Sequence, residues 1–277
     1  MPKSIRLQGP TDDTITPMQS LVYWRRKCER TSSSFSGMHI GTYKAATFNK
    51  TIHQMKTDVV NIAYRMGLTI PRWTYDLDVT LLKKIDRIKP SDMRTIGQLE
   101  ADFNQGASLH FGKRMMKNAM KHRAIPESQY SKPMSRAIEA ALVKTMFFDY
   151  LRLHRLPGAF CAMDLMQCFD RMAHPVSSLA AQRLGVPKNI SQSMIRTIMS
   201  MKHYIRTAYG DSDFYYGGED EDFVLQGAIQ GNGAASPLFI AISCVLLTFL
   251  ESYIIGFNIR TAITCTVIAI AAVIVCR

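Results

Sequence analysis

The chain has 277 residues, enough for one large domain or two ordinary ones, and its 47% apolar content allows a substantial hydrophobic core. Lys and Arg outnumber Asp and Glu by 34 to 22, a net charge of +12. This charge suits a polyanionic partner such as nucleic acid or an anionic membrane face. It fits equally well a cationic protein that has no such partner.

The six cysteines form no CxxC pair, which excludes zinc-site spacing of that type. The N-terminal sequence MPKSIRLQGP lacks the apolar core of a secretory signal. We therefore expect reduced cysteines and an intracellular protein of the nucleus or cytoplasm.

The predicted elements of the first half are mostly helices. Residues 1–37 are polar, and their start is expected to be disordered. Apolar spacing predicts a helix over 51–66, which Gly67 ends, and alternation predicts a strand over 74–81. Further helices are predicted over 108–121 and 135–153.

The second half mixes strands and helices. A buried strand is predicted over 159–163, helices over 173–184 and 191–201, and strands over 204–209 and 214–216 with a turn at 210–212. A short strand over 223–225 and a helix from Pro237 follow. This order of elements indicates a mixed α+β fold.

Two segments carry chemical signals. Asp164 follows the apolar strand directly, where a rigid base can hold a metal-binding carboxylate, although aspartates at strand ends are more often caps or turn residues. Phe169-Asp170 then opens a helix. The second segment, QGAIQGNGAASP at 226–237, is rich in glycine and nearly uncharged, so its backbone can approach a flat ligand closely. It matches neither a P-loop nor a dinucleotide fingerprint, and it could equally be a flexible turn.

In this order, the two segments resemble the palm of reverse transcriptases from non-LTR-type retroelements. The family patterns D-x-x-x-x-[FY]-D and Q-G-x-x-x-S-P-x-[LF] correspond to Asp164 with Phe169-Asp170, and to Gln230-Gly231 with 236–239. Weaker similarity to the fingers of the family lies upstream, at residues 36–41, 82–84, 93–99 and 129–138. The resemblance implies polymerase fingers and a partial palm, without a thumb. It divides the chain into an N-terminal extension with the start of the fingers (1–75), mostly helical fingers (76–157) and the partial palm (158–277).

The resemblance also implies residue roles in template-directed DNA synthesis. Asp164 would be catalytic and bind Mg²⁺, or Mn²⁺ in its place. Phe169 would select deoxynucleotides, Gln230 and Gly231 would contact the incoming dNTP and the template, and Arg94 and Lys84 would contact the triphosphate. The implied partners are an RNA or DNA template-primer and dNTPs. Two-metal nucleotidyl transfer needs such carboxylates and cations to hold the ions and neutralise phosphate charge.

The chain departs from the family at two points. Four residues separate Gln230-Gly231 from Ser236-Pro237, one more than in the family pattern. The aromatic-x-Asp-Asp motif of the family is missing after Phe239, where Glu251 is the only carboxylate. Because one carboxylate binds Mg²⁺ weakly, we expect this chain alone to be an inactive fragment.

Two other functions remain open. The first is a non-catalytic nucleic-acid-binding module that keeps the basic fingers. The second is a small two-span membrane protein, because the runs 237–250 and 261–276 are strongly apolar, although each is shorter than a comfortable bilayer span.

Overall fold

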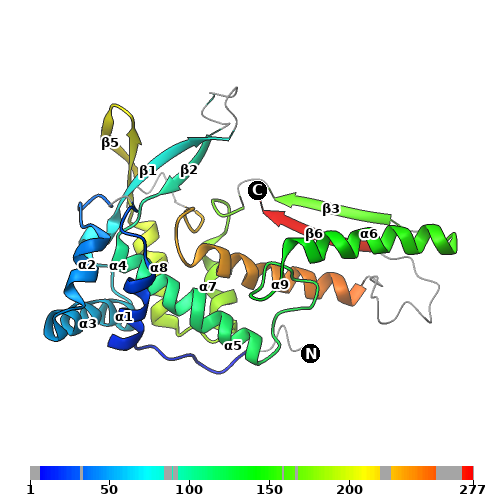
Figure 1. The fold of residues 1–277 in the computed structure, drawn as a ribbon, viewed down its shortest axis with the longest axis horizontal. Helices are drawn as coiled ribbons and strands as arrows, with labels where there is room; N and C mark the ends of the chain where they lie inside the picture. Colours follow the sequence, from blue (N-terminus) through cyan, green and yellow to red (C-terminus); the bar gives the residue numbers. More distant parts are fainter. Residues whose placement is uncertain are drawn as a thin grey trace.

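A computed structural model describes residues 7–31, 34–83, 89, 93–157, 159–165, 168–218, 226–253 and 270–276, with the backbone alone in 159–165 and 270–276. The fold is mixed α+β, as the order of predicted elements indicated. Figure 1 shows helices α1 to α3 and a sheet at one end of the molecule, and helix α6 with strands β3 and β6 at the other.

The first half of the chain contains α1 (Pro17–Arg26), α2 (Ile40–Ala46), α3 (Lys50–Met66), the 3₁₀ turn η2 (Pro71–Thr74), β1 (Tyr75–Leu82), β2 (Met93–Gly97), α4 (Ala101–Ala107), the π-helical stretch η4 (Ser108–Met115), α5 (Met116–Lys121) and α6 (Ala137–His154). The second half contains β3 (Ala159–Leu165), α7 (His174–Arg183), α8 (Lys188–Met199), β4 (Lys202–Thr207), β5 (Gly210–Gly217), α9 (Ala235–Tyr253) and β6 (Ile270–Cys276).

Four strands form a mixed sheet in the order β2-β1-β4-β5. Strand β1 pairs antiparallel with β2 and parallel with β4, and β4 pairs antiparallel with β5. The register places Asp76 beside His203 and Asp78 beside Gly97, so these side chains share one face. Tyr75 and residues at alternate positions of β4 and β5 lie on the opposite face. A separate parallel pair joins β3 to β6.

Local signals explain the boundaries of α3 and the start of α1. Asn49 caps the N-terminus of α3 through its side chain, and Gly67 ends the helix at φ 68°, as predicted. Helix α1 was not predicted, although Thr16 and Gln19 form a reciprocal capping box and Pro17 occupies the first turn.

The predicted helix over 108–121 is correct but too short, because α4, η4 and α5 run without interruption from Ala101 to Lys121. The missed first turns bury polar side chains, among them Asp102 and Gln105, which a sequence pattern scores as exposed. Gly106 lies against the Tyr64 ring, where a Cβ atom would overlap the ring. A glycine inside the helix therefore lets α4 approach α3 closely.

The hairpin of β4 and β5 differs from the prediction at its turn. The turn lies at residues 208–209, and the segment 210–212, predicted as the turn, begins β5 instead. Gly210, the first residue of β5, has a φ of 130°, a backbone conformation that favours glycine. The turn therefore lies closer to the N-terminus than predicted. The predicted strand over 223–225 lies outside the described residues. The strand predicted over 159–163 is present as β3.

One hydrophobic core connects residues from all three predicted segments of the chain. Its largest buried rings are Tyr64, Trp73 and Phe103, whose centroids lie 5.4–6.3 Å apart. Burial of each ring contributes on the order of 2–3 kcal/mol. The domain boundaries at 75/76 and 157/158 remain predictions.

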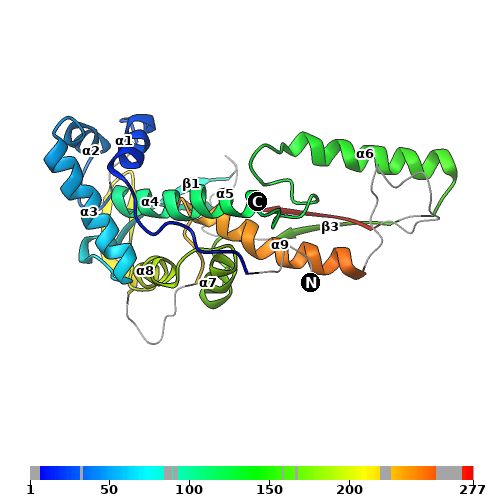
Figure 2. The ribbon, with the colours of Figure 1, turned by 90° about the horizontal axis from the view of Figure 1, so that it is seen from below.

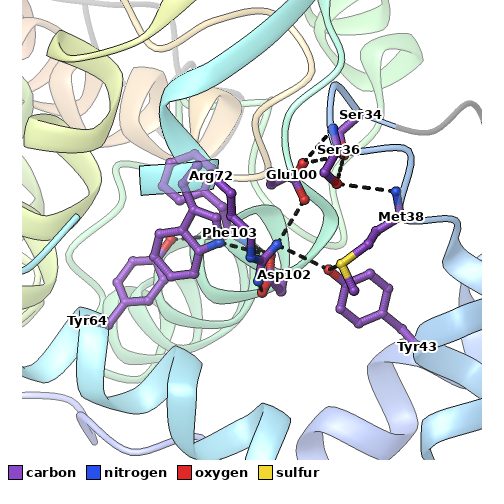
Figure 3. Close-up of polar contacts among 10 residues, drawn as sticks. Ser34, Ser36, Met38, Tyr43, Tyr64, Arg72, Glu100, Asp102 and Phe103 are labelled. Atoms are coloured by element: carbon purple, nitrogen blue, oxygen red, sulfur yellow. Dashed lines mark hydrogen bonds and ion pairs between the residues drawn. The ribbon is translucent and has the colours of Figure 1, made fainter. Parts of the chain in front are cut away.

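A cluster that we call the Arg72 clasp consists of Arg72, Glu100 and Asp102 (Figure 3). The guanidinium group bonds Glu100 at 2.9 Å and both carboxylate oxygens of Asp102. The Trp73 indole donates to Asp102 at 2.9 Å, and Ser34 donates to Glu100 at 2.8 Å. The clasp therefore ties the segment before α2, the turn η2 and the start of α4 together.

The remaining elements lie beside the core. Figure 2 shows α6 and α9 on either side of strand β3. Among the helices that the structure describes, none combines the length and the apolar character that a bilayer span requires. Cys168 is disulfide-bonded, so the expectation of reduced cysteines is wrong for this residue.

Candidate functional site

A cavity of about 240 Å³ lies between the sheet and the glycine-rich loop. Its wall is formed by residues from β1, β2, α8, β4 and β5 and from two connecting segments: Asp78, Thr95, Gly97, Asp170, Ile198, His203, Tyr216, Gln226, Ile229 and Gln230. Seven of these ten side chains are polar or charged. Three of them, Asp78, Asp170 and His203, are ionisable and could contact an ion or a charged group of a ligand.

The start of the glycine-rich loop is bound to the segment that follows β3. The Gly227 N–H donates to the Met172 carbonyl at 2.9 Å, and the Ala228 N–H donates to the Phe169 carbonyl at 2.8 Å. The His174 Nε2 lies 2.7 Å from the Gly227 carbonyl. Burial lowers the pKa of His174, so the neutral ring holds this contact at neutral pH as the donor. These bonds bring the Phe169-Asp170 turn beside the loop.

The end of the loop is bound to the sheet and to α4. The Gly97 N–H donates to the Gln230 carbonyl at 2.8 Å. The Asn104 side chain donates to the Gly231 carbonyl at 3.0 Å and accepts from the Gly233 N–H at 2.7 Å. The loop is thus held on both sides, and it is not the loose turn that its composition allows.

Glycine is required at two positions of this loop. Gly227 has a φ of 89°, and a Cβ atom there would lie 2.6 Å from the backbone of Asp170. Gly231 has a φ of 121°, and a Cβ atom there would overlap the Gly97 carbonyl oxygen. Any other residue would therefore meet both backbone strain and a backbone clash. The loop approaches its neighbours through backbone atoms alone at these points.

Three buried side chains lie at the sheet side of the cavity. Asp76 is 0% exposed, Asp78 3% and His203 5%. The His203 Nδ1 lies 3.3 Å from an oxygen of Asp76 and 3.1 Å from an oxygen of Asp78. Tyr216 donates its hydroxyl to the same oxygen of Asp78 and stacks on the His203 ring at 5.0 Å. Two carboxylates and an imidazole in this arrangement could hold a metal ion.

The electrostatics of the cavity reflect this concentration of acidic groups. Burial alone would lower the pKa of His203, but the hydrogen bonds and charges of Asp76 and Asp78 outweigh burial and raise it to about 9. Burial raises the pKa of Asp76, and the Asp78 charge adds to the effect. Burial and the Asp78 charge also raise the pKa of Asp170. A cation in the cavity would relieve this repulsion.

The structure brings some of the sequence-predicted site residues together. Gln230 lines the cavity, Gly231 follows it, and Phe169 lies at the other end of the loop, with its ring edge-on to Phe239 at a centroid distance of 6.2 Å. Arg94 is exposed on β2, opposite Leu81 of β1.

Two further predicted site residues are Asp164 and Lys84. Asp164 lies in β3, where it pairs with Val275 of β6, and its side chain lies outside the described residues. Lys84 also lies outside the described residues.

The buried cluster of Asp76, Asp78 and His203 was not predicted from the sequence. One signal was present, because two aspartates at alternate positions of a predicted strand must point to the same face. Paired carboxylates on one face are a common metal-ligand arrangement. His203 could not be added to the pair from the sequence, since its place depends on the parallel pairing of β1 with β4.

A scan against protein-family models finds no match for this chain, and a search of curated proteins finds none either.

Proposed function

We propose that the chain is the fingers and part of the palm of a reverse-transcriptase-type polymerase, and that its cavity binds an incoming dNTP. The observation that carries this proposal is the position of the loop at 226–233. It is bonded at one end to the segment of Phe169 and at the other to Gly97 of β2. The loop at 226–233 and the Phe169-Asp170 turn therefore lie beside β2, and Asp170, Gln230 and Gly97 line one cavity, which supports the proposal.

The proposed roles follow from chemistry and position. Asp164 would bind Mg²⁺ or Mn²⁺ through its carboxylate, and these ions would neutralise charge on the triphosphate. Arg94 is exposed on β2, on the face of the strand opposite Thr95 and Gly97, so it would reach phosphate oxygens around the open edge of this strand. Lys84 would bond phosphate oxygens as well. Gln230 and the backbone of Gly231 would contact the base and sugar. The Phe169 ring would pack against the 2′ position of the sugar and so select deoxynucleotides.

Nucleotide binding tests this proposal directly. The full chain would be titrated with dATP and with ATP in the presence of Mg²⁺, by calorimetry. We expect dATP to bind more tightly than ATP, and Phe169→Ala to reduce this preference. Arg94→Ala should weaken dATP binding by about 10- to 100-fold, because one charge-assisted hydrogen bond is lost. Lys50→Ala, which removes an exposed positive charge from α3, is the matched control and should leave the affinity unchanged.

Two results would contradict the proposal. The first is an absence of measurable dATP binding by the folded chain. The second is binding that Arg94→Ala and Lys50→Ala weaken equally, since this indicates nonspecific attraction to the positive net charge. A primer-extension assay tests catalysis separately. DNA synthesis that Asp164→Ala abolishes would place catalysis in this chain and contradict the expectation of an inactive fragment.

A second candidate function, a nucleic-acid-binding module, is favoured by a different surface. The aromatic face consists of Phe35, Tyr75, Tyr204 and Tyr215, on the side of the sheet opposite the cavity. Phe35 stacks on Tyr75 at 4.9 Å and lies 4.9 Å from Tyr204, and Tyr204 lies 5.6 Å from Tyr215. The Lys202 ammonium group lies 4.7 Å from the Tyr215 ring centre. Phe35 and Tyr215 are exposed, whereas Tyr75 and Tyr204 are half-buried. Exposed rings beside a cation are suited to stacking of unpaired bases.

Binding of fluorescent single-stranded DNA and RNA tests this function. We expect the affinity to fall with salt and Tyr215→Ala to weaken binding by about 5- to 100-fold, because one stacked base is lost. Phe48→Ala, at a site 90% exposed on another surface, is the control. Equal effects of the two substitutions would exclude the aromatic face as the binding surface.

A further inference from the structure

The cluster of Asp76, Asp78 and His203 lies apart from the residues to which the proposed function assigns metal binding. We propose that these three side chains bind one divalent ion of the zinc class, with an open coordination position that faces the cavity. The proposal does not depend on the polymerase interpretation. It rests on the unmet bonding of the cluster, on its geometry and on its charge.

The Asp76 carboxylate is buried with few bonding partners. Both carboxylate oxygens of Asp76 are buried and have no hydrogen-bond partner among the residues that the structure describes. The His203 Nδ1 can donate one hydrogen, and Asp78 lies nearer to it than Asp76 does. Asp76 is therefore left with one ion-pair contact to the His203 ring, which it shares with Asp78, and a buried carboxylate with so few partners is strongly unfavourable. A metal ion between the three groups gives Asp76 a direct partner, whereas the buried Nε2 of His203 stays without one among the described residues.

The spacing of the candidate ligand atoms fits a metal ion. Ligands about 2.1 Å from a metal ion stand about 3.0 Å apart at octahedral angles and about 3.4 Å apart at tetrahedral angles. The distances of 3.1 and 3.3 Å from Nδ1 to the two carboxylates lie between these values. One candidate ligand atom from each residue lies within 4.8 Å of the others. A metal ion can therefore enter with small side-chain movements.

The charge and the ligand types of the cluster also favour a divalent ion of the zinc class. Two ionised carboxylates carry two negative charges, which a divalent ion balances fully and a protonated histidine balances by half. A mixed nitrogen and oxygen ligand set favours Zn²⁺ over Mg²⁺, which prefers oxygen ligands and retains several waters. The Tyr216 hydroxyl, bonded to Asp78, would orient that ligand from outside the coordination sphere.

The surroundings define the open position. Asp78 and His203 line the cavity, whereas Asp76 is fully buried behind them. Gly97, opposite Asp78, has no side chain, and a Cβ atom there would overlap the Asp76 carboxylate. Three protein ligands with one open position are typical of zinc sites that bind a water molecule or a substrate oxygen. In this cavity the fourth ligand would be water or a phosphate oxygen.

Titration of the full, chelator-treated chain with Zn²⁺, and with Co²⁺ as its coloured substitute, tests the proposal. We expect one ion per chain and a Co²⁺ visible spectrum of four- or five-coordinate nitrogen and oxygen ligands. Asp76→Asn and His203→Gln should each lower the affinity at least 100-fold, with circular dichroism confirming that the variants fold. Asp211→Asn, on an exposed carboxylate of the same sheet, should bind normally. Asp164→Ala should also bind normally, which separates this site from the proposed polymerase site.

X-ray absorption of the Zn²⁺-loaded wild-type chain gives an answer even if the ligand variants do not fold. We expect only nitrogen and oxygen neighbours at about 2.0–2.2 Å. Sulfur neighbours would assign the ion to cysteines and overturn the proposal. An absence of stoichiometric binding would overturn it as well, as would unchanged affinity in both folded ligand variants.

Discussion

Replacement of Arg72 by methionine tests how much the Arg72 clasp stabilises the fold. The substitution keeps most of the apolar stem and removes the guanidinium group that joins Glu100 and Asp102. Both carboxylates are nearly inaccessible, at 0% and 4% exposed, and would be left buried without their cation. Breaking a buried ion pair in this way costs about 3–5 kcal/mol.

Two features of the clasp reduce this cost. The Arg72 side chain is 33% exposed, so water can partly replace it beside the carboxylates. The Trp73 indole and the Ser34 hydroxyl also remain as donors to the two acids. We therefore expect Arg72→Met to lower the free energy of unfolding by about 3 kcal/mol, near the lower end of that range.

Urea denaturation followed by circular dichroism measures this loss. Arg65→Met is the matched control, because Arg65 forms an ion pair with Asp13 in which both side chains are about half exposed. This substitution should cost less than about 1 kcal/mol. Equal costs for the two variants would refute the assignment of the clasp as a buried stabilising network. A double variant with Asp102→Asn should cost less than the sum of the two single changes, because the partners interact directly.

Three further outcomes are expected. Burial lowers the pKa of His110 to about 3, below about 6.5 in the unfolded chain, so its stabilising contribution is complete above pH 6.5 and is lost as the pH falls toward 3. Between pH 7 and 5 the wild type should lose about 2 kcal/mol in urea denaturation through this residue, and His110→Gln should remove that part of the pH dependence. Gly97→Ala should lower stability by about 1–3 kcal/mol in thermal unfolding, because its Cβ would overlap Asp76, and an unchanged melting temperature would contradict this packing. Thr16→Ala should cost about 1 kcal/mol in the same assay through loss of the α1 capping box, whereas Thr16→Ser should cost much less.

The sequence predicted elements well where the deciding contacts are local. Helix α3 begins at Asn49 and ends at Gly67, and both residues act within one turn of the helix. Strand β1 follows from the alternation of its side chains. Helix α4 was missed because its polar residue Asp102 is buried by Arg72, a contact that no local pattern records. Helix α1 was missed although its deciding contacts are local. Its capping box of Thr16 and Gln19 is visible in the sequence, but the prediction did not include it.

The candidate site also has a part that the sequence predicted and a part that it did not. The two motif segments were singled out from the sequence, and the bonds from Gly227 and Ala228 to the segment of Phe169 place them side by side. The buried cluster was not predicted. Alternation puts Asp76 and Asp78 on one face, but it does not tell which face is covered. That depends on β4, which pairs with β1 from the other half of the chain and supplies His203.

Gly97 links the two proposed ligand sites physically. Its N–H donates to the Gln230 carbonyl of the loop. A Cβ atom at Gly231 would overlap its carbonyl oxygen. On its other side, its missing Cβ leaves room for the Asp76 carboxylate. A movement of β2 at this residue must therefore shift the loop and the cluster together. If both proposals hold, Gly97→Ala should weaken dATP and Zn²⁺ binding in the same variant, whereas Arg94→Ala should weaken only the first and Asp76→Asn chiefly the second.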